Sequence, residues 1–149
     1  MKIAIGSDHR GIKQRAWVAN AIRRAGGDVV DLGTHSEESY DYPDIAAEVG
    51  EQVSEGKVDR GVLICGTGIG VSIAANKIPG VRAAVCHDMH TAMMSRRHND
   101  ANVLCLPGDA LTEAQLESMV IEWLKTDFEG GRHQRRVDKI TALEASRCE

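Results

Sequence analysis

A cysteine and three closely spaced glycines mark the stretch of this sequence that is best suited to chemistry. The apolar residues 62–64 are followed by Cys65, and glycines occupy positions 66, 68 and 70. The pattern predicts a buried strand, a tight loop with outward-pointing N–H groups and the start of a helix, which together stabilise an anion or a developing oxyanion. The same surroundings favour the thiolate of Cys65. This stretch therefore predicts a thiolate beside an oxyanion cradle.

Two familiar glycine motifs do not fit this loop. A phosphate-binding P-loop requires Lys and then Ser or Thr after its last glycine, whereas Gly70 is followed by Val71 and Ser72. A dinucleotide-binding loop requires the spacing GxGxxG after the first strand, whereas here the third glycine comes one residue early and the loop lies near mid-chain. The spacing therefore favours neither kind of nucleotide site.

Three other groups of polar residues have positions that suit a ligand. Asp8 and His9 follow the first apolar run, where they could bind a phosphate or form only an Asx turn. His98 follows a helical segment, where it could act as an acid or complement the helix dipole. Arg132 and Arg136 are four residues apart on one helix face and could clamp a phosphate, although a solvated basic face is the simpler interpretation.

Together these residues suggest a small phosphorylated polyol held beside a thiolate and a histidine. The matching reaction is proton abstraction next to a carbonyl group, through an enediolate, which needs a base, an oxyanion cradle and an acid. Cys65, the glycine loop and His98 could supply these three parts.

Composition argues against several other classes of protein. The net charge of -4 gives no broad electrostatic footprint for nucleic acid, and no apolar run approaches the ~20 residues of a membrane span. The six histidines lack HxxxH or HExxH spacing and the four cysteines lack CxxC spacing, so no metal site is expected. Reduced thiols at the ends of apolar runs fit a cytoplasmic protein best.

Apolar runs alternate with helical patterns along all 149 residues. This alternation predicts an α/β fold of three layers, in which helices cover both faces of a five-stranded parallel sheet within a single domain, 1–149. Ligands of such folds bind beyond the carboxyl ends of the strands. The predicted strands are 2–6, 29–32, 62–65, 81–86 and 102–106, and the predicted helices are 12–25, 44–55, one after the glycine loop, 87–97, 113–125 and a basic helix, 132–146.

Several motifs in this order resemble those of ribose-5-phosphate isomerase type B, and the resemblance covers nearly the whole chain. The motifs are Ser-Asp-His at 7–9, Asp-Tyr-Pro at 41–43, Cys-Gly-Thr-Gly-Ile-Gly at 65–70 with Ser-Ile-Ala-Ala-Asn-Lys at 72–77, Ser-Arg-Arg-His-Asn-Asp-Ala-Asn at 95–102 and Glu-Gly-Gly-Arg-His at 129–133. The resemblance implies a Rossmann-like fold that interconverts ribose 5-phosphate and ribulose 5-phosphate without a metal or another cofactor.

The resemblance also implies roles for individual residues. Cys65 would move the proton between C1 and C2, and His98 would help to open the furanose ring with Asp8 as its partner. The substrate contacts would come from Asp8, His9, Tyr42, Gly66, Thr67, Gly68, Ile69, Gly70, Asn99, Arg132 and Arg136. The family further implies a homodimer, possibly assembled into a tetramer, in which His98 reaches into the neighbour's site.

Two positions separate this chain from other members of the family that it resembles. Val71 stands where one branch has a glutamate, which makes this a cysteine-type member. Asp109 stands where the family usually offers an arginine to the substrate. This difference leaves six-carbon substrates as an alternative, namely allose 6-phosphate or galactose 6-phosphate.

Binding modules of a similar fold are the alternatives from another class. A receiver domain needs an aspartate where Cys65 stands, and a flavodoxin-like module needs a Ser/Thr-rich loop after the first strand and more than the five aromatic residues present. A colourless preparation would argue against a flavin.

Overall fold

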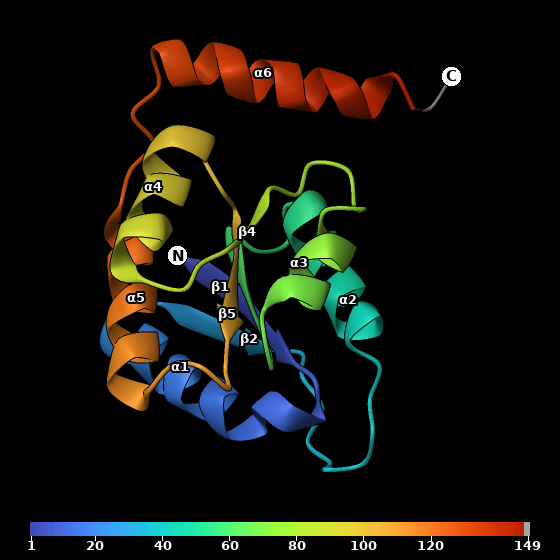
Figure 1. Ribbon diagram of the computed structural model, residues 1–149, viewed down its shortest axis with the longest axis vertical. Helices are drawn as coiled ribbons and strands as arrows, with labels where there is room; N and C mark the ends of the chain where they lie inside the picture. Colours follow the sequence, from blue (N-terminus) through green and yellow to red (C-terminus); the bar gives the residue numbers. More distant parts are fainter. Residues whose placement is uncertain (148–149) are drawn as a thin grey trace.

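A computed structural model of the chain describes residues 1–147, so Cys148 lies outside the described residues. It consists of one five-stranded sheet with helices on both faces, which confirms the predicted α/β fold of three layers (Figure 1). In chain order the elements are β1 (Lys2–Ser7), η1 (His9–Gly11), α1 (Ile12–Arg24), β2 (Asp28–Asp31), α2 (Tyr42–Ser54), β3 (Arg60–Cys65), α3 (Ile69–Ala75), β4 (Ala83–Val85), α4 (Met89–Asn99), β5 (Val103–Pro107), α5 (Glu113–Lys125) and α6 (Arg132–Ala145).

All strand pairs are parallel, and the strands lie in the order β2-β1-β3-β5-β4. The register places the last residues of the three central strands together, since Ser7 pairs with Ile64 and Cys65 pairs with Pro107. The carboxyl ends of β1, β3 and β5 therefore form one edge of the sheet. We call this the carboxyl edge, and the opposite one the amino edge.

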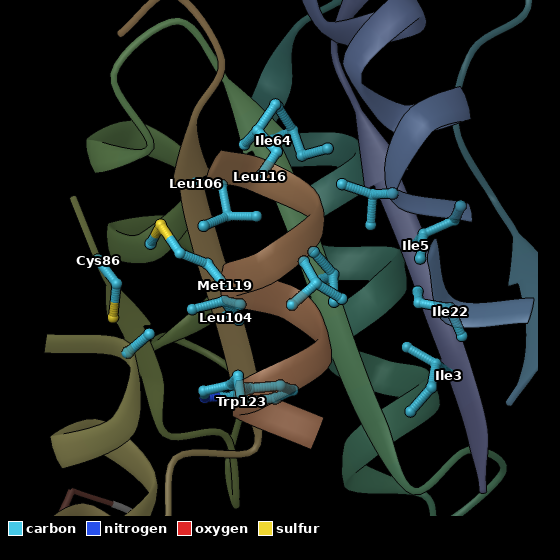
Figure 2. Packing of buried hydrophobic residues seen from close by; sticks show 14 of the residues in the cluster. Ile3, Ile5, Ile22, Ile64, Cys86, Leu104, Leu106, Leu116, Met119 and Trp123 are labelled. Carbon is cyan, nitrogen blue, oxygen red and sulfur yellow. The ribbon is translucent and has the colours of Figure 1, made fainter. Parts of the chain in front are cut away.

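Each face of the sheet carries its own hydrophobic core, because successive strand side chains point to opposite faces. Ile5, Ile64 and Leu106 face the core that α1, α4 and α5 cover, where Trp123 is fully buried (Figure 2). Leu63 and Cys105 face the second core, which α2 and α3 cover. Burial on both faces accounts for the nearly continuous apolar runs of the central strands.

Side-chain hydrogen bonds shift two predicted element boundaries. The helix predicted at 87–97 begins at Met89, because the Asp88 carboxylate accepts a hydrogen bond from the N–H of Thr91 and caps the helix. The strand predicted at 81–86 is shorter in the structure, Ala83–Val85, and it begins after Arg82, whose N–H donates to the side-chain oxygen of Asn102. The helix at 113–125 is confirmed, with Thr112 in a capping box.

Helices that follow parallel strands return the chain to the amino edge, so helix ends and strand ends lie at opposite sides of the sheet. α4 has 11 residues and spans about 16 Å from the carboxyl edge to the amino edge. α6 lies beyond the amino edge and crosses the end of α4 (Figure 1). Only His133 and Val137 of α6 are buried, while Ile140 and Leu143 are exposed. α6 is thus the least embedded helix of residues 1–147.

No helix within residues 1–147 combines the length and the apolar character that crossing a membrane requires.

Candidate active site

Cys65 ends β3 at the carboxyl edge, and its thiol is nearly buried. Its Sγ accepts a hydrogen bond from the backbone N–H of Gly68 at 3.1 Å. Gly68 can turn its N–H back toward the sulfur because it adopts a left-handed conformation, with φ of 74°. This hydrogen bond fixes the sulfur at the end of β3, beside the glycine loop.

The other two described cysteines are buried more completely than Cys65. Cys86 and Cys105 are buried in the two cores, and burial raises the pKa of both thiols. These side chains act as small hydrophobic residues. Cys65 is therefore the candidate base among the three.

The glycine loop after Cys65 presents backbone N–H groups to the outside. Those of Gly66, Thr67 and Gly70 have no hydrogen-bond acceptor within residues 1–147. Thr67 caps the loop, because its hydroxyl accepts a hydrogen bond from the N–H of Ile69 at 3.2 Å. A Cβ at position 70 would lie 2.6 Å from the ring of Tyr42, so the loop and this ring pack tightly. The loop can therefore stabilise a negatively charged oxygen close to Cys65.

Asp8 and His9 lie beside this loop, where β1 ends. The Asp8 carboxylate is nearly buried and accepts a hydrogen bond from the N–H of Arg10, which is the predicted Asx turn. Nδ1 of His9 accepts a hydrogen bond from the N–H of Tyr40 at 3.1 Å. This bond places the proton of the neutral imidazole on Nε2, where it can donate to a ligand.

Arg15 holds the segment that carries Tyr40 and Tyr42. Its buried guanidinium donates to Ser7 Oγ at 2.7 Å and to the carbonyl oxygen of Thr34 at 2.6 Å, and its Nε lies 3.0 Å from Asp31 Oδ1. The sequence does carry a signal for this residue: Arg15 lies on the same face of α1 as the buried Val18 and Ala19, and a cation on an apolar helix face must find partners.

Replacing Arg15 by alanine is expected to lower the free energy of unfolding by about 2–4 kcal/mol, because Ser7, Asp31 and the Thr34 carbonyl lose their shared donor. Urea denaturation measures this change. Arg24→Ala is the matched control, since Arg24 forms only a surface ion pair with Glu117 at 2.8 Å and should cost at most about 1 kcal/mol. Equal losses in the two variants would contradict the assigned role of Arg15.

The remaining predicted site residues lie at the amino edge. His98 near the end of α4 stacks on His133 of α6, with ring centroids 4.2 Å apart and planes inclined by 9°. Glu129 Oε2 lies 3.5 Å from Nε2 of His133 and 4.0 Å from that of His98. Burial lowers the pKa of His133, and the neighbouring His98 and Arg132 lower it further, so His133 favours its neutral form.

Three other predicted residues flank this cluster. Arg132 and Arg136 are both exposed on the first two turns of α6, so both guanidinium groups can bind an anion. Asn99 ends α4, and its backbone carbonyl accepts a hydrogen bond from Arg82 Nε, which leaves the side-chain amide for other contacts.

His98, Glu129 and His133 are also the one group in residues 1–147 whose donor atoms cluster closely enough to hold a metal ion, all within 4.8 Å of one another. The two imidazole planes are nearly parallel, so their nitrogen lone pairs point side by side rather than toward a common centre. Zinc requires lone pairs that converge on it at about 2.1 Å. The stacked arrangement therefore fits a metal ion poorly.

One chain therefore places the predicted site residues in two separate groups, which we call candidate half-sites. Cys65, the glycine loop, Asp8, His9 and Tyr42 meet at the carboxyl edge, whereas a second group lies at the amino edge, about the length of α4 away. That second group comprises His98, Asn99, Arg132 and Arg136. This separation follows from the direction of α4. A helix that connects two parallel strands runs back from the carboxyl edge to the amino edge, where the next strand begins.

Comparisons with known proteins identify the family of this chain. Residues 3–140 match the family model described as Ribose/Galactose Isomerase. The chain is 49% identical over 148 residues to ribose-5-phosphate isomerase B of Escherichia coli (strain K12), covering 98% of each.

Solved structures of similar proteins agree with the fold as well. Clostridium thermocellum ribose-5-phosphate isomerase B superimposes with a TM-score of 0.95 at 50% identity, over 98% of this chain and 99% of that one. The enzyme of the same name from Mycoplasma genitalium, solved with bound ribulose-5-phosphate, gives 0.93 at 43% identity, over 97% and 96%. This chain therefore belongs to the ribose/galactose isomerase family.

Proposed function

We propose that this protein interconverts ribose 5-phosphate and ribulose 5-phosphate, the reaction that its relatives are named for. The observation that carries the proposal is the thiol of Cys65, held by the N–H of Gly68 beside a loop with unused N–H donors. This pairing of a base with an oxyanion cradle is what an enediolate reaction requires.

In the proposed reaction the Cys65 thiolate removes the hydrogen on C2 of the open-chain aldose as a proton. The electron pair of the C–H bond forms a C1–C2 double bond, and the C1 oxygen becomes negatively charged. The N–H groups of Gly66, Thr67 and Gly70 stabilise that charge. The thiol then returns the proton to C1, while the proton of the C2 hydroxyl passes to the C1 oxygen. The products are the ketose and the starting thiolate.

Ring opening must precede this step, because the furanose ring hides the aldehyde. We propose that His98 donates the proton that the ring oxygen needs and that the Asp8 carboxylate accepts the proton of the C1 hydroxyl. The stacked His133 and the Glu129 carboxylate hold the imidazole of His98.

A homodimer would bring the two half-sites together. In a symmetric interface each subunit offers its amino-edge group to the carboxyl edge of its partner. The surface supports this assembly: Ile69 and Ile73 of α3 are exposed, and so are Ile140 and Leu143 of α6. A groove of about 360 Å³ also opens between α6 and β4, lined in part by Ile140, Leu143 and Ala84. A second copy that covers these apolar side chains would remove them from water.

Arg132 and Arg136 of the partner would meet the phosphate near His9. We expect Arg132→Ala to raise KM more than it lowers kcat, because a phosphate remote from C1 and C2 contributes mainly uniform binding. Steady-state kinetics with ribose 5-phosphate measure both constants. Arg24→Ala is the control and should leave KM unchanged, since Arg24 lies at the end of α1 and forms only a surface ion pair with Glu117. Turnover of unphosphorylated ribose as fast as of its phosphate would rule out the clamp.

An isomerase assay over aldose phosphates tests the proposed function directly. The expected result is higher kcat/KM for ribose 5-phosphate than for allose 6-phosphate or galactose 6-phosphate. The six-carbon substrates stay the second candidate, because the Asp109 side chain lies against Gly66 at a position where the family usually offers an arginine to the substrate. The assay should need neither metal nor cofactor, and no isomerisation of any of these sugars would overturn the proposal.

A further inference from the structure

Arg10 and Asp109 meet across the mouth of the carboxyl-edge half-site, although they are 99 residues apart in the chain. Arg10 Nη2 donates to Asp109 Oδ2 at 2.7 Å. Arg10 belongs to η1 and follows His9 directly, and Asp109 follows the end of β5. Both side chains are about half exposed. The pair therefore joins the residues after β1 to those after β5.

The glycine loop lies against this pair. A Cβ at position 66 would lie 2.8 Å from Asp109 Oδ2 and 3.5 Å from Arg10 Nη1. The backbone N–H of Asp109 donates to the Gly66 carbonyl at 3.1 Å, so the backbone fixes the position of the carboxylate. The pair therefore packs against Gly66, the residue that follows Cys65.

Charge explains why such a pair belongs here. A sugar phosphate arrives as an anion, and the carboxylate of Asp109 alone would repel it. Arg10 cancels that charge, and a guanidinium has five N–H donors in a rigid fork. Asp109 takes one of them, and Nη1 lies over the loop with donors to spare.

We propose that Arg10 is a substrate-binding residue of this enzyme, which donates to the phosphate from the same subunit as Cys65, and that Asp109 is the positioning residue that aims it. The proposal rests on the proposed isomerase function. It supplies the carboxyl-edge half-site with a cation of its own, beside His9.

Kinetics on variants of the pair test this assignment. Arg10→Ala should raise KM for ribose 5-phosphate about tenfold or more, with kcat changed less than about threefold. The constant for competitive inhibition by inorganic phosphate should rise by a similar factor. Arg24→Ala is the matched control, because Arg24 has the same exposure and also forms an ion pair, at 2.8 Å, yet lies away from the site. It should leave both constants unchanged.

Exchanging the two charges gives a second, independent measurement. Arg10→Asp alone puts two carboxylates at the mouth and should raise KM further than Arg10→Ala does. The double variant Arg10→Asp with Asp109→Arg restores a paired guanidinium over Gly66 and should recover most of the loss in KM. A thermal melt of every variant shows that it is folded.

The outcomes separate the two proposals. If the unmodified protein isomerises no sugar phosphate, the proposed function fails. If it is active and Arg10→Ala keeps its KM, the assignment of Arg10 is overturned and the function stands. A raised KM with unchanged inhibition by phosphate also overturns the assignment, because Arg10 would then contact the sugar instead.

Discussion

Replacing Cys65 by alanine is expected to lower kcat for ribose 5-phosphate by about 10²–10⁴-fold or more, because the proton on C2 loses its base. KM should change little, since the thiol acts at C1 and C2 and contributes little to binding of the phosphate. Cys65→Ser should be nearly as inactive, because a serine hydroxyl is a far weaker acid than a thiol and needs an adjacent base to act as one itself. Coupled measurement of ribulose 5-phosphate formation gives both constants.

Cys86→Ala is the control for this experiment. Its thiol is buried in the core under α4, on the other face of the sheet from Cys65, so the variant should keep kcat while it loses some stability. A thermal melt of Cys65→Ala establishes that the fold is intact. Turnover of Cys65→Ala close to that of the unmodified protein would remove this residue from the mechanism.

Mixing two inactive variants should restore activity if the site is shared between subunits. In a dimer of Cys65→Ala with His98→Ala, one site carries both lesions and the other carries none. Each purified mixed dimer keeps one intact site of its two and should therefore show about half of full activity. The unpurified random mixture, in which about half of the dimers are mixed, should show about a quarter. Co-expression with two different affinity tags yields the mixed dimers, and their activity is measured after purification through both tags.

The same design provides its own control. A single chain that carries both substitutions, paired with the unmodified chain, leaves one lesion in each site of the mixed dimer. Those dimers should be inactive, whereas a site contained within one subunit would keep half of their activity. Absence of recovery in the first mixture, with the mixed dimers isolated, would contradict the shared site.

The fold could be predicted from sequence because strands buried on both faces leave few alternatives. Apolar runs such as residues 62–64 fit only a covered parallel sheet in a chain that alternates strand and helix. The order of the strands is a different matter. Nothing in the three residues of β4 specifies that β5 lies between it and β3. That order depends on how both cores pack, which no local pattern records.

The candidate site divides along the same line. Asp8 and Cys65 could be placed because each directly follows or ends a strand, and strand ends share an edge. His98 was grouped with them by chemistry, whereas the direction of α4 carries it to the other edge. The contact between Arg10 and Asp109 depends on two loops that only the finished sheet brings together. Long-range pairs of this kind leave no spacing signal in the sequence.

The position of β5 in the sheet also determines how long one side of β3 stays unpaired during synthesis of the chain. β4 precedes β5 in the sequence but pairs only with it, and one side of β3 stays unpaired until β5 arrives. At the usual speeds of translation the roughly 40 residues between the ends of β3 and β5 take about 2–8 s to synthesise. During that interval the apolar run that leads to Cys65 forms the open edge of a three-stranded sheet, a template for pairing with other chains. The nascent protein is therefore most vulnerable to aggregation just before its fifth strand is made.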